Sequence, residues 1–325
     1  MNLTPTEPEP PTDLGGESNT PSRRASFIEG LAAALRFLLP LGRRRAPIHP
    51  ATFDRATSWI VPLGLLVGLL WAGTFRATWK IYGEIATVRV VPALMIVLIE
   101  SFFTGLYLVL GLARTVHLLA GEHPLRSEPH SGDIANQGPA SGPEPAPSNP
   151  LSPEPLSPLG TLALCLAVLC QWVLITSIPW ESPWWPAPRD WRHYFNFLYP
   201  APLYRPLLLA PIWGRWGLLL AATIGRTARH VDSETIGLSQ AMSPARLLRQ
   251  TILPLALTAI YCSRGGNLAI GIILSMLVFG VTYLVAVVMA RLGGGQSRQS
   301  LYAAGQIAQL AFLALSRAFW LFIHR

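Results

Sequence analysis

Charged side chains are scarce in this sequence. They make up 13% of the 325 residues, about half the share that is usual in a soluble protein. Hydrophobic residues make up 51%, and they lie in long apolar blocks of the kind that form membrane-spanning helices. These two observations exclude an ordinary water-soluble domain and predict a polytopic membrane protein.

Acidic residues are few and unevenly placed. The chain has 17 Asp and Glu against 25 Lys and Arg, and Lys80 is the single lysine among the basic residues. No Asp or Glu follows Glu234. The arginines flank the apolar blocks, which the positive-inside rule explains better than nucleic-acid binding does. We therefore expect membrane lipid around the protein and no nucleic-acid partner.

Cysteine is rare as well. Cys165, Cys170 and Cys262 all fall within apolar segments, and their spacing is not that of a metal site. We expect them to be small buried hydrophobic side chains.

Seven apolar segments are candidates for membrane spans, and a shorter one precedes them. Residues 27–41 are too few to span comfortably and are followed by three arginines, so we expect an interfacial helix there on the cytoplasmic face. The seven candidates are residues 59–75, 90–113, 159–178, 207–224, 247–262, 268–290 and 303–323. The first and fifth are short for a bilayer core of about 30 Å. The expected fold is all-α, a polytopic bundle of about seven spans.

Two polar segments accompany the bundle. Residues 1–24 are rich in Pro and Glu and are expected to be a disordered tail, and residues 25–325 form the membrane domain. Within that domain, residues 121–158 are rich in Pro, Ser and Gly and should be a flexible loop. With the N-terminus inside, fifteen Lys and Arg lie in inner segments and eight in outer ones. This bias predicts a multi-pass protein of the inner cell membrane with a cytoplasmic N-terminus.

The most informative stretch runs from Thr104 to His117 and reads TGLYLVLGLARTVH. It resembles the phrase T-G-(G/A)-L-H-L-D-G-L-A-D-T-x-D of the adenosylcobinamide-GDP ribazoletransferases, also called cobalamin synthases. The framework positions that match without a gap are Thr104, Gly105, Gly111, Leu112, Ala113 and Thr115. Where the family has aspartates, this sequence has Leu110, Arg114 and His117.

Other stretches resemble the same family. Residues 59–68 (WIVPLGLLVG) are similar to W-F-P-L-V-G-L-L-I-G, and residues 210–216 (APIWGRW) are similar to A-P-x-x-G-R-W. Residues 294–309 resemble G-G-x-T-G-D-x-L followed by G-A-x-x-E-L-T-E. In that region the family's aspartate is replaced by Gln299 and its two glutamates by Gln306 and Gln309.

The resemblance implies a membrane transferase that completes the nucleotide loop of cobalamin. Such an enzyme joins adenosylcobinamide-GDP to α-ribazole and releases GMP, and it needs Mg²⁺ held by carboxylates. The missing acids favour a catalytically inactive relative that binds corrinoid intermediates or other cobalamin-assembly enzymes in the membrane. A divergent but active transferase remains an alternative. A transporter is a weaker one, because the sequence has no internal repeat.

The candidate pocket follows from the family positions and includes no assigned catalytic residue or metal ligand. Arg215 lies in an apolar span, so it should face the interior, where it could hold phosphate or pair with helix-end carbonyls. Glu100 is an intramembrane acid that would share one helix face with Thr104 and Arg114, either as a functional group or as a hydrogen-bonded packing residue. His117 could bind phosphate or metal, or lie at the interface.

The pocket residues are Thr104, Leu110, Gly111, Arg114, Thr115, His117, Arg215, Gln299, Gln306 and Gln309. We expect one cavity to be lined by Leu110, Arg114, Gln299 and Gln306.

Overall fold

The computed structural model describes residues 27–39, 52–82, 90–104, 106–120, 156–178, 203–228, 231–262 and 268–324. Within these ranges the regular structure is helical, and the pairing of Thr227 with Gln296 is an isolated β-bridge. The all-α prediction is confirmed. The predicted tail and nearly all of the predicted loop lie outside the described residues.

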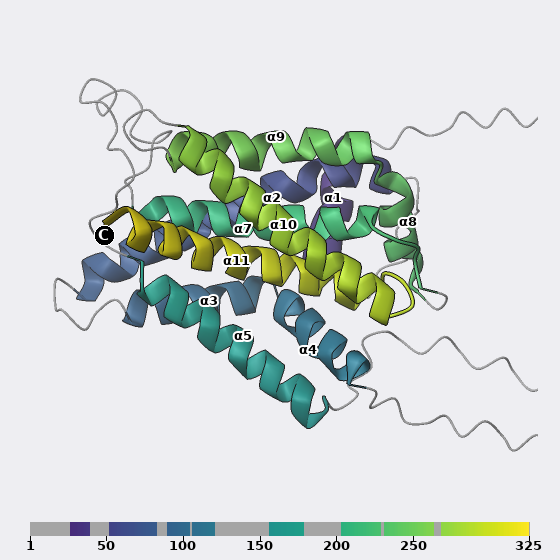
Figure 1. Ribbon diagram of the computed structural model, residues 1–325, viewed down its shortest axis with the longest axis horizontal. Helices are drawn as coiled ribbons and strands as arrows, with labels where there is room; N and C mark the ends of the chain where they lie inside the picture. Colours follow the sequence, from purple (N-terminus) through teal and green to yellow (C-terminus); the bar gives the residue numbers. More distant parts are fainter. Residues whose placement is uncertain are drawn as a thin grey trace, which may run out of the picture.

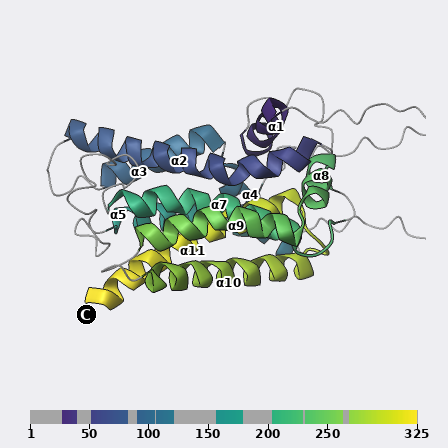
Figure 2. The same ribbon diagram turned by 90° about the horizontal axis from the view of Figure 1, so that it is seen from above.

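The described helices run side by side as a bundle (Figure 1). They are α1 (Phe27–Leu38), α2 (Phe53–Tyr82), α3 (Val90–Thr104), α4 (Tyr107–Leu119), α5 (Pro158–Thr176), α7 (Tyr204–Thr223), α8 (Ser233–Ala241), α9 (Pro244–Tyr261), α10 (Ala269–Leu292) and α11 (Arg298–His324). The short helix α8, the ends of α4 and α10 and the start of α11 gather at one end of the bundle, on the right in Figure 1. Helix α1 packs against α2 near the same end (Figure 2).

Five of these helices are long and apolar enough to cross a membrane, and α3 with α4 make a sixth span if they are taken together. The multi-pass class is therefore as predicted, although about seven spans were expected. Helix α9 accounts for part of the difference. It packs beside α7 and α10, but Arg246, Arg249 and Gln250 in its first two turns make it less apolar than the five. The expected short span at 59–75 lies within the 30-residue helix α2.

The centre of the bundle is α7. Every residue from Arg205 to Ala222 is buried, because α2, α9, α10 and α11 pack around this helix. A helix that is covered on all sides can carry polar groups without exposing them to lipid. This position explains how α7 can contain buried arginines.

Glycines let the helices around α7 approach one another closely. A Cβ atom at Gly68 of α2 would lie 2.2 Å from the carbonyl oxygen of Leu208, and one at Gly217 of α7 would lie 2.5 Å from the Cβ of Ala308. Gly64, in the same motif as Gly68, also meets the α7 backbone. Small residues commonly serve this purpose in membrane helices. The glycines of the sequence motif at residues 59–68 are thus explained by packing.

The expected single helix over residues 90–113 is divided into α3 and α4, which are bent by 80° relative to each other. Between them Leu106 has φ 59° and ψ 13°, the left-handed backbone conformation that residues other than glycine rarely adopt. Because of this bend, Glu100 and Arg114 do not share one face of a continuous helix. The motif residues of α4 are instead directed toward the start of α11, with which α4 makes extensive contact.

The cysteines differ in their environments. Cys262 is buried as expected, whereas Cys165 and Cys170 are exposed on the outside of α5. The expectation of burial was wrong for these two, because α5 packs on the bundle along only a narrow strip.

Candidate functional site

A group of polar side chains is buried where α3, α5, α7 and α11 meet, and we call it the buried polar cluster. Its members are Glu100, Gln171, Arg215, Gln306 and Gln309, and none is more than 7% exposed. Four of these five stand at positions that the sequence singled out. Helix packing therefore brings the intramembrane acid and the intramembrane arginine into one site.

The Glu100 carboxylate is the centre of the cluster. Gln309 Nε2 lies 3.2 Å from its Oε1 and 3.3 Å from its Oε2, and Gln171 Nε2 also donates to Oε2. Arg215 Nη1 is 3.7 Å from Glu100 Oε1 and donates to Gln309 Oε1 at 3.2 Å. Gln306 Nε2 donates to Gln171 Oε1 at 3.0 Å. Both carboxylate oxygens are therefore engaged by donors of the protein itself.

The charges of the cluster compensate one another. An unpaired carboxylate or guanidinium at this depth would be strongly destabilising, and a pair that is also hydrogen-bonded is much less so. Arg215 lies in the interior, where its place in an apolar span predicted it to be. Its partners in the described structure are Glu100 and Gln309, in place of the phosphate or helix-end carbonyls considered from the sequence.

The buried polar cluster does not fit Mg²⁺. This ion takes near-octahedral oxygen ligands at about 2.0–2.1 Å, with carboxylates among them. The cluster has one carboxylate, and a guanidinium lies 3.7 Å from it. Gln306 and Gln309 direct amide N–H groups toward their neighbours. No group of three or more His, Cys, Asp and Glu residues within the described ranges is placed to hold a metal ion.

A second group of motif residues lies where α4 meets the start of α11. Leu110, Gly111, Arg114 and Gln299 line a cavity of about 40 Å³ together with Tyr107, Arg298 and Tyr302. Gly111 sets the spacing of the two helices, because a Cβ there would lie 2.5 Å from the Cβ of Tyr302 and 2.9 Å from the carbonyl oxygen of Gln299. The resemblance had placed these positions together, and in the structure they line the same small space.

Gln306 does not share this cavity. It lies two turns farther along α11 and lines a separate space of about 10 Å³ with Glu100, Thr104 and Gln171. The expected single cavity with four residues is therefore divided, with Leu110, Arg114 and Gln299 on one side and Gln306 on the other.

The remaining predicted residues have structural contacts. Thr104 Oγ1 donates to the carbonyl of Glu100 at 2.7 Å, and Thr115 Oγ1 donates to that of Gly111 at 2.8 Å. His117 is half-buried beside the start of α5, where a Cβ at Gly160 would lie 3.3 Å from the His117 Cβ. Neither Thr115 nor His117 lines either cavity.

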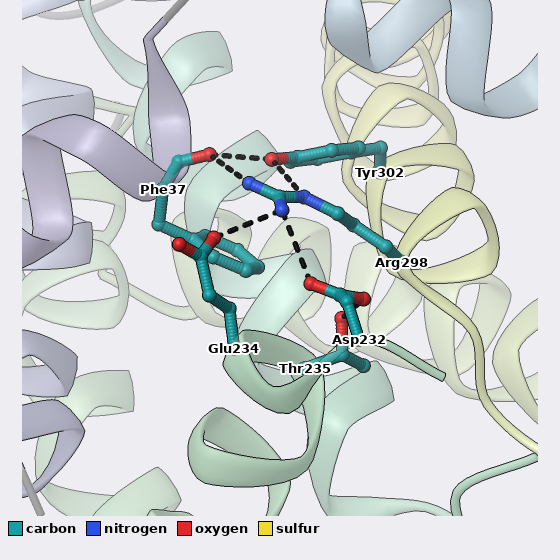
Figure 3. Close-up of polar contacts among 6 residues, drawn as sticks. All are labelled: Phe37, Asp232, Glu234, Thr235, Arg298 and Tyr302. Carbon is teal, nitrogen blue, oxygen red and sulfur yellow. Dashed lines mark hydrogen bonds and ion pairs between the residues drawn. The ribbon is translucent and has the colours of Figure 1, made fainter. Parts of the chain in front are cut away.

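Sequence reasoning missed a charged group at the start of α11, shown in Figure 3. Arg298 Nη1 lies 3.1 Å from Asp232 Oδ2 and 2.9 Å from Glu234 Oε2. Its Nε is 3.1 Å from the hydroxyl of Tyr302, and its Nη2 is 3.4 Å from the carbonyl oxygen of Phe37. This one side chain therefore connects α11 with α8 and α1. One feature of the sequence could have indicated this group, because Asp232 and Glu234 are the last two acidic residues of the sequence.

Gln171 was also missed. It is the only amide side chain in the apolar stretch 159–178, and a polar residue within a span usually faces a partner. Its contacts with Glu100 and Gln306 show why it lies on the packed face of α5.

Comparison with known families agrees with the motifs. The model of a family described as cobalamin-5-phosphate synthase matches residues 157–316, from the residue before α5 into the last third of α11. The phrase from Thr104 to His117 lies outside this segment, so its resemblance stays a prediction. No curated protein and no solved structure matches the chain. Residues 157–316, which are 160 of the 325 residues, are therefore similar to the cobalamin synthase family, as the motifs within this segment predicted.

Proposed function

We propose that this chain is a catalytically inactive relative of the cobalamin synthases that binds a corrinoid intermediate at the membrane during cobalamin assembly. The observation that carries the proposal is the buried polar cluster. Gln306 and Gln309 stand where the family has glutamates, and the cluster uses its one carboxylate to balance Arg215.

Charge explains why this arrangement opposes catalysis. Transfer of a phosphoryl-type group develops negative charge that bound metal ions normally neutralise. Loss of such a clamp costs several kcal/mol of barrier, or roughly a thousandfold or more in rate. Leu110, Arg114 and Gln299 line the cavity at the family's aspartate positions, and none of them is an anionic ligand.

The cavity between α4 and α11 is where we place the intermediate. At about 40 Å³ it has room for the phosphate end of such a molecule and none for a corrin ring. The ring would stay outside, at the end of the bundle. Arg114 lines the cavity, and arginine suits phosphate oxygens. Arg298 also lines it, but this side chain is already paired with Asp232 and Glu234.

The experiment uses the full chain in lipid nanodiscs. We expect adenosylcobinamide-GDP to bind, and we expect no cobalamin to form when α-ribazole and Mg²⁺ are added. Arg114→Gln should weaken binding, whereas Arg249→Gln, which removes an exposed charge on α9, should not. Turnover that a chelator abolishes would contradict the inactive assignment, and absence of binding would contradict the corrinoid role.

An active transferase with relocated ligands is the second candidate, and one observation favours it. Asp232 and Glu234 lie within 3.1 Å of the same nitrogen of Arg298, so two carboxylates converge beside the motif that carries Gln299. If the chain is such an enzyme, Asp232→Asn with Glu234→Gln should abolish activity. A chain that is inactive before this change excludes the second candidate.

A further inference from the structure

A third cavity lies apart from the buried polar cluster and from the cavity between α4 and α11. It measures about 300 Å³ and lies between the ends of α7 and α10 and the loop that leads into α11. Its polar lining comes from Arg226, Arg291 and the backbone of Gly294 and Gly295, and Ala290 lies in its wall. None of these residues lines the cavity between α4 and α11.

The charges of this cavity are not balanced by the protein. Arg226 and Arg291 are exposed, and neither side chain makes a salt bridge or hydrogen bond within the described ranges. Among the residues that the structure describes, no acidic side chain lines the space. Two guanidinium groups around one concavity repel each other, and an anion between them removes that repulsion while accepting several hydrogen bonds.

The backbone fixes where the two arginines are. Gln296 N donates to the carbonyl of Arg226 at 2.8 Å, and Ala228 N donates to that of Gln296 at 3.0 Å. Gly294 and Gly295 have φ 65° and 135°, and a Cβ at Gly295 would lie 2.7 Å from Ala228 N. These contacts join the loop after α10 to the segment after α7, so the protein itself fixes the backbone that carries the two arginines beside the cavity.

The ligand contacts should come from side chains. The N–H groups of Gly293 and Gly295 already donate to the carbonyls of Met289 and Ala290. These bonds also satisfy two of the carbonyl groups at the end of α10, which would otherwise repel an anion. A Cβ at Gly294 would meet nothing within 4 Å, which leaves the approach to the arginines open.

We propose that this cavity binds a phosphate or diphosphate group between Arg226 and Arg291. Its volume is at the lower end of the range of small-molecule sites, about 300–1,000 Å³. It lies at the end of the bundle where the spans stop, so the group could belong to an anionic lipid or to a dissolved phosphorylated compound. The inference does not depend on corrinoid binding, because it uses different residues.

The test has two arms with the purified full-length chain. In detergent, inorganic diphosphate is titrated and its affinity is measured by calorimetry. In nanodiscs, thermal stability is compared between phosphatidylcholine alone and phosphatidylcholine mixed with phosphatidylglycerol. The expected result is binding in at least one arm that weakens by about tenfold or more in Arg226→Gln/Arg291→Gln, since two charge-assisted contacts are lost.

Two control variants make the test specific. Arg249→Gln removes an exposed arginine of α9 and should bind as the native chain does. Ala290→Phe keeps both charges but fills the cavity, so it should also weaken binding. Diphosphate binding alone would assign the site to a dissolved phosphate compound, and a response to phosphatidylglycerol alone would assign it to lipid. The proposal is overturned if neither arm shows binding, or if Arg249→Gln loses as much as the double variant.

Discussion

Glu100 and Gln309 come from different helices, yet both contact the guanidinium group of Arg215. Arg215 Nη1 is 3.7 Å from the carboxylate of one and 3.2 Å from the amide oxygen of the other. The acid that balances Arg215 is therefore supplied by α3, while the family's glutamate position on α11 holds the amide. One negative charge within this group is required by Arg215, but its position need not be fixed.

A charge exchange tests this view. Glu100→Gln should destabilise the chain by about 3–5 kcal/mol, because it leaves Arg215 buried without a counter-charge. Adding Gln309→Glu should recover most of that loss, since the new carboxylate would lie beside the same guanidinium. The measurement is thermal unfolding in detergent. Gln309→Glu alone, which places two acids together, is the control and should destabilise. If the effects of the two changes simply add, the charges do not exchange as described.

Arg298 permits a second prediction at this scale. Arg298→Ala removes the hydrogen bonds to Asp232, Glu234 and the carbonyl of Phe37. Hydrogen bonds to charged groups contribute about 1.5–3 kcal/mol each, so we expect a marked loss of stability. Hydrogen exchange should increase in α1 and α8 and remain unchanged in α5. Equal exchange in all three helices would contradict a role of Arg298 in holding α1 and α8.

The sequence identified several residues of the site, but it did not predict which of them contact one another. It identified Glu100 and Arg215 because charged residues in apolar spans are conspicuous. It did not predict that they pair, because the two residues are 115 positions apart in the chain and their contact depends on how each helix is rotated. Asp232 and Glu234 were missed for a similar reason, since their partner Arg298 lies on another helix.

Helix packing in this protein depends on where glycines meet a neighbouring backbone. Gly68→Ala would bring a Cβ to 2.2 Å from the carbonyl oxygen of Leu208. The two helices would have to separate, and we expect a loss of about 1–3 kcal/mol, as is typical of overpacking. Gly73→Ala in the same helix meets nothing within 4 Å. It should be neutral or stabilising by about 0.5–1 kcal/mol.

Thermal unfolding of these two α2 variants is the measurement. Because both add one methyl group to the same helix, their difference isolates the contact with α7. A loss in Gly73→Ala as large as that in Gly68→Ala would mean that the cost does not come from the contact with α7.

Most helices could be placed from the sequence, because long apolar runs determine their positions. The break between α3 and α4 could not, since TGLYLVLG has no proline and reads as a continuous apolar segment. The bend depends on Leu106 adopting a positive φ, which tertiary packing stabilises against its local preference. The sequence predicted a span at α9 because the second half of this helix is apolar, although two arginines lie near its start.

For the whole molecule, the two ends of the bundle differ. The ends of α4, α7 and α10 and the starts of α5 and α11 lie together, near α1 and α8, whereas the C-terminal end of α11 lies at the opposite end (Figure 1). If α3 and α4 are taken together and the short helices α1 and α8 are left out, successive helices alternate in direction (Figure 1), as they would in a multi-pass membrane protein. Arg226, Arg291 and Arg298 all lie at the end that contains α1.

The positive charges predict that this end faces the cytoplasm. We expect a cysteine at Ser141 to be protected from a membrane-impermeant reagent added outside, and a cysteine at Ser182 to be labelled. Both positions lie outside the described residues, in segments that the charge distribution assigns to opposite sides. The background chain has Cys165, Cys170 and Cys262 replaced by serine or alanine. Labelling of Ser141→Cys from outside intact cells would reverse the orientation.

The enclosure of α7 has a consequence for how the protein is made. In the finished bundle 94% of its span is covered, and Arg205 and Arg215 lie within it. Helix α11, which supplies Gln309 and packs closely at Gly214 and Gly217, is synthesised after the other described helices. Until it arrives, α7 has both arginines in place and an open side toward lipid or the insertion machinery. Burial of α7 is therefore complete only once α11 has been translated, and we expect a chain that stalls before Arg298 to be degraded faster than the full chain.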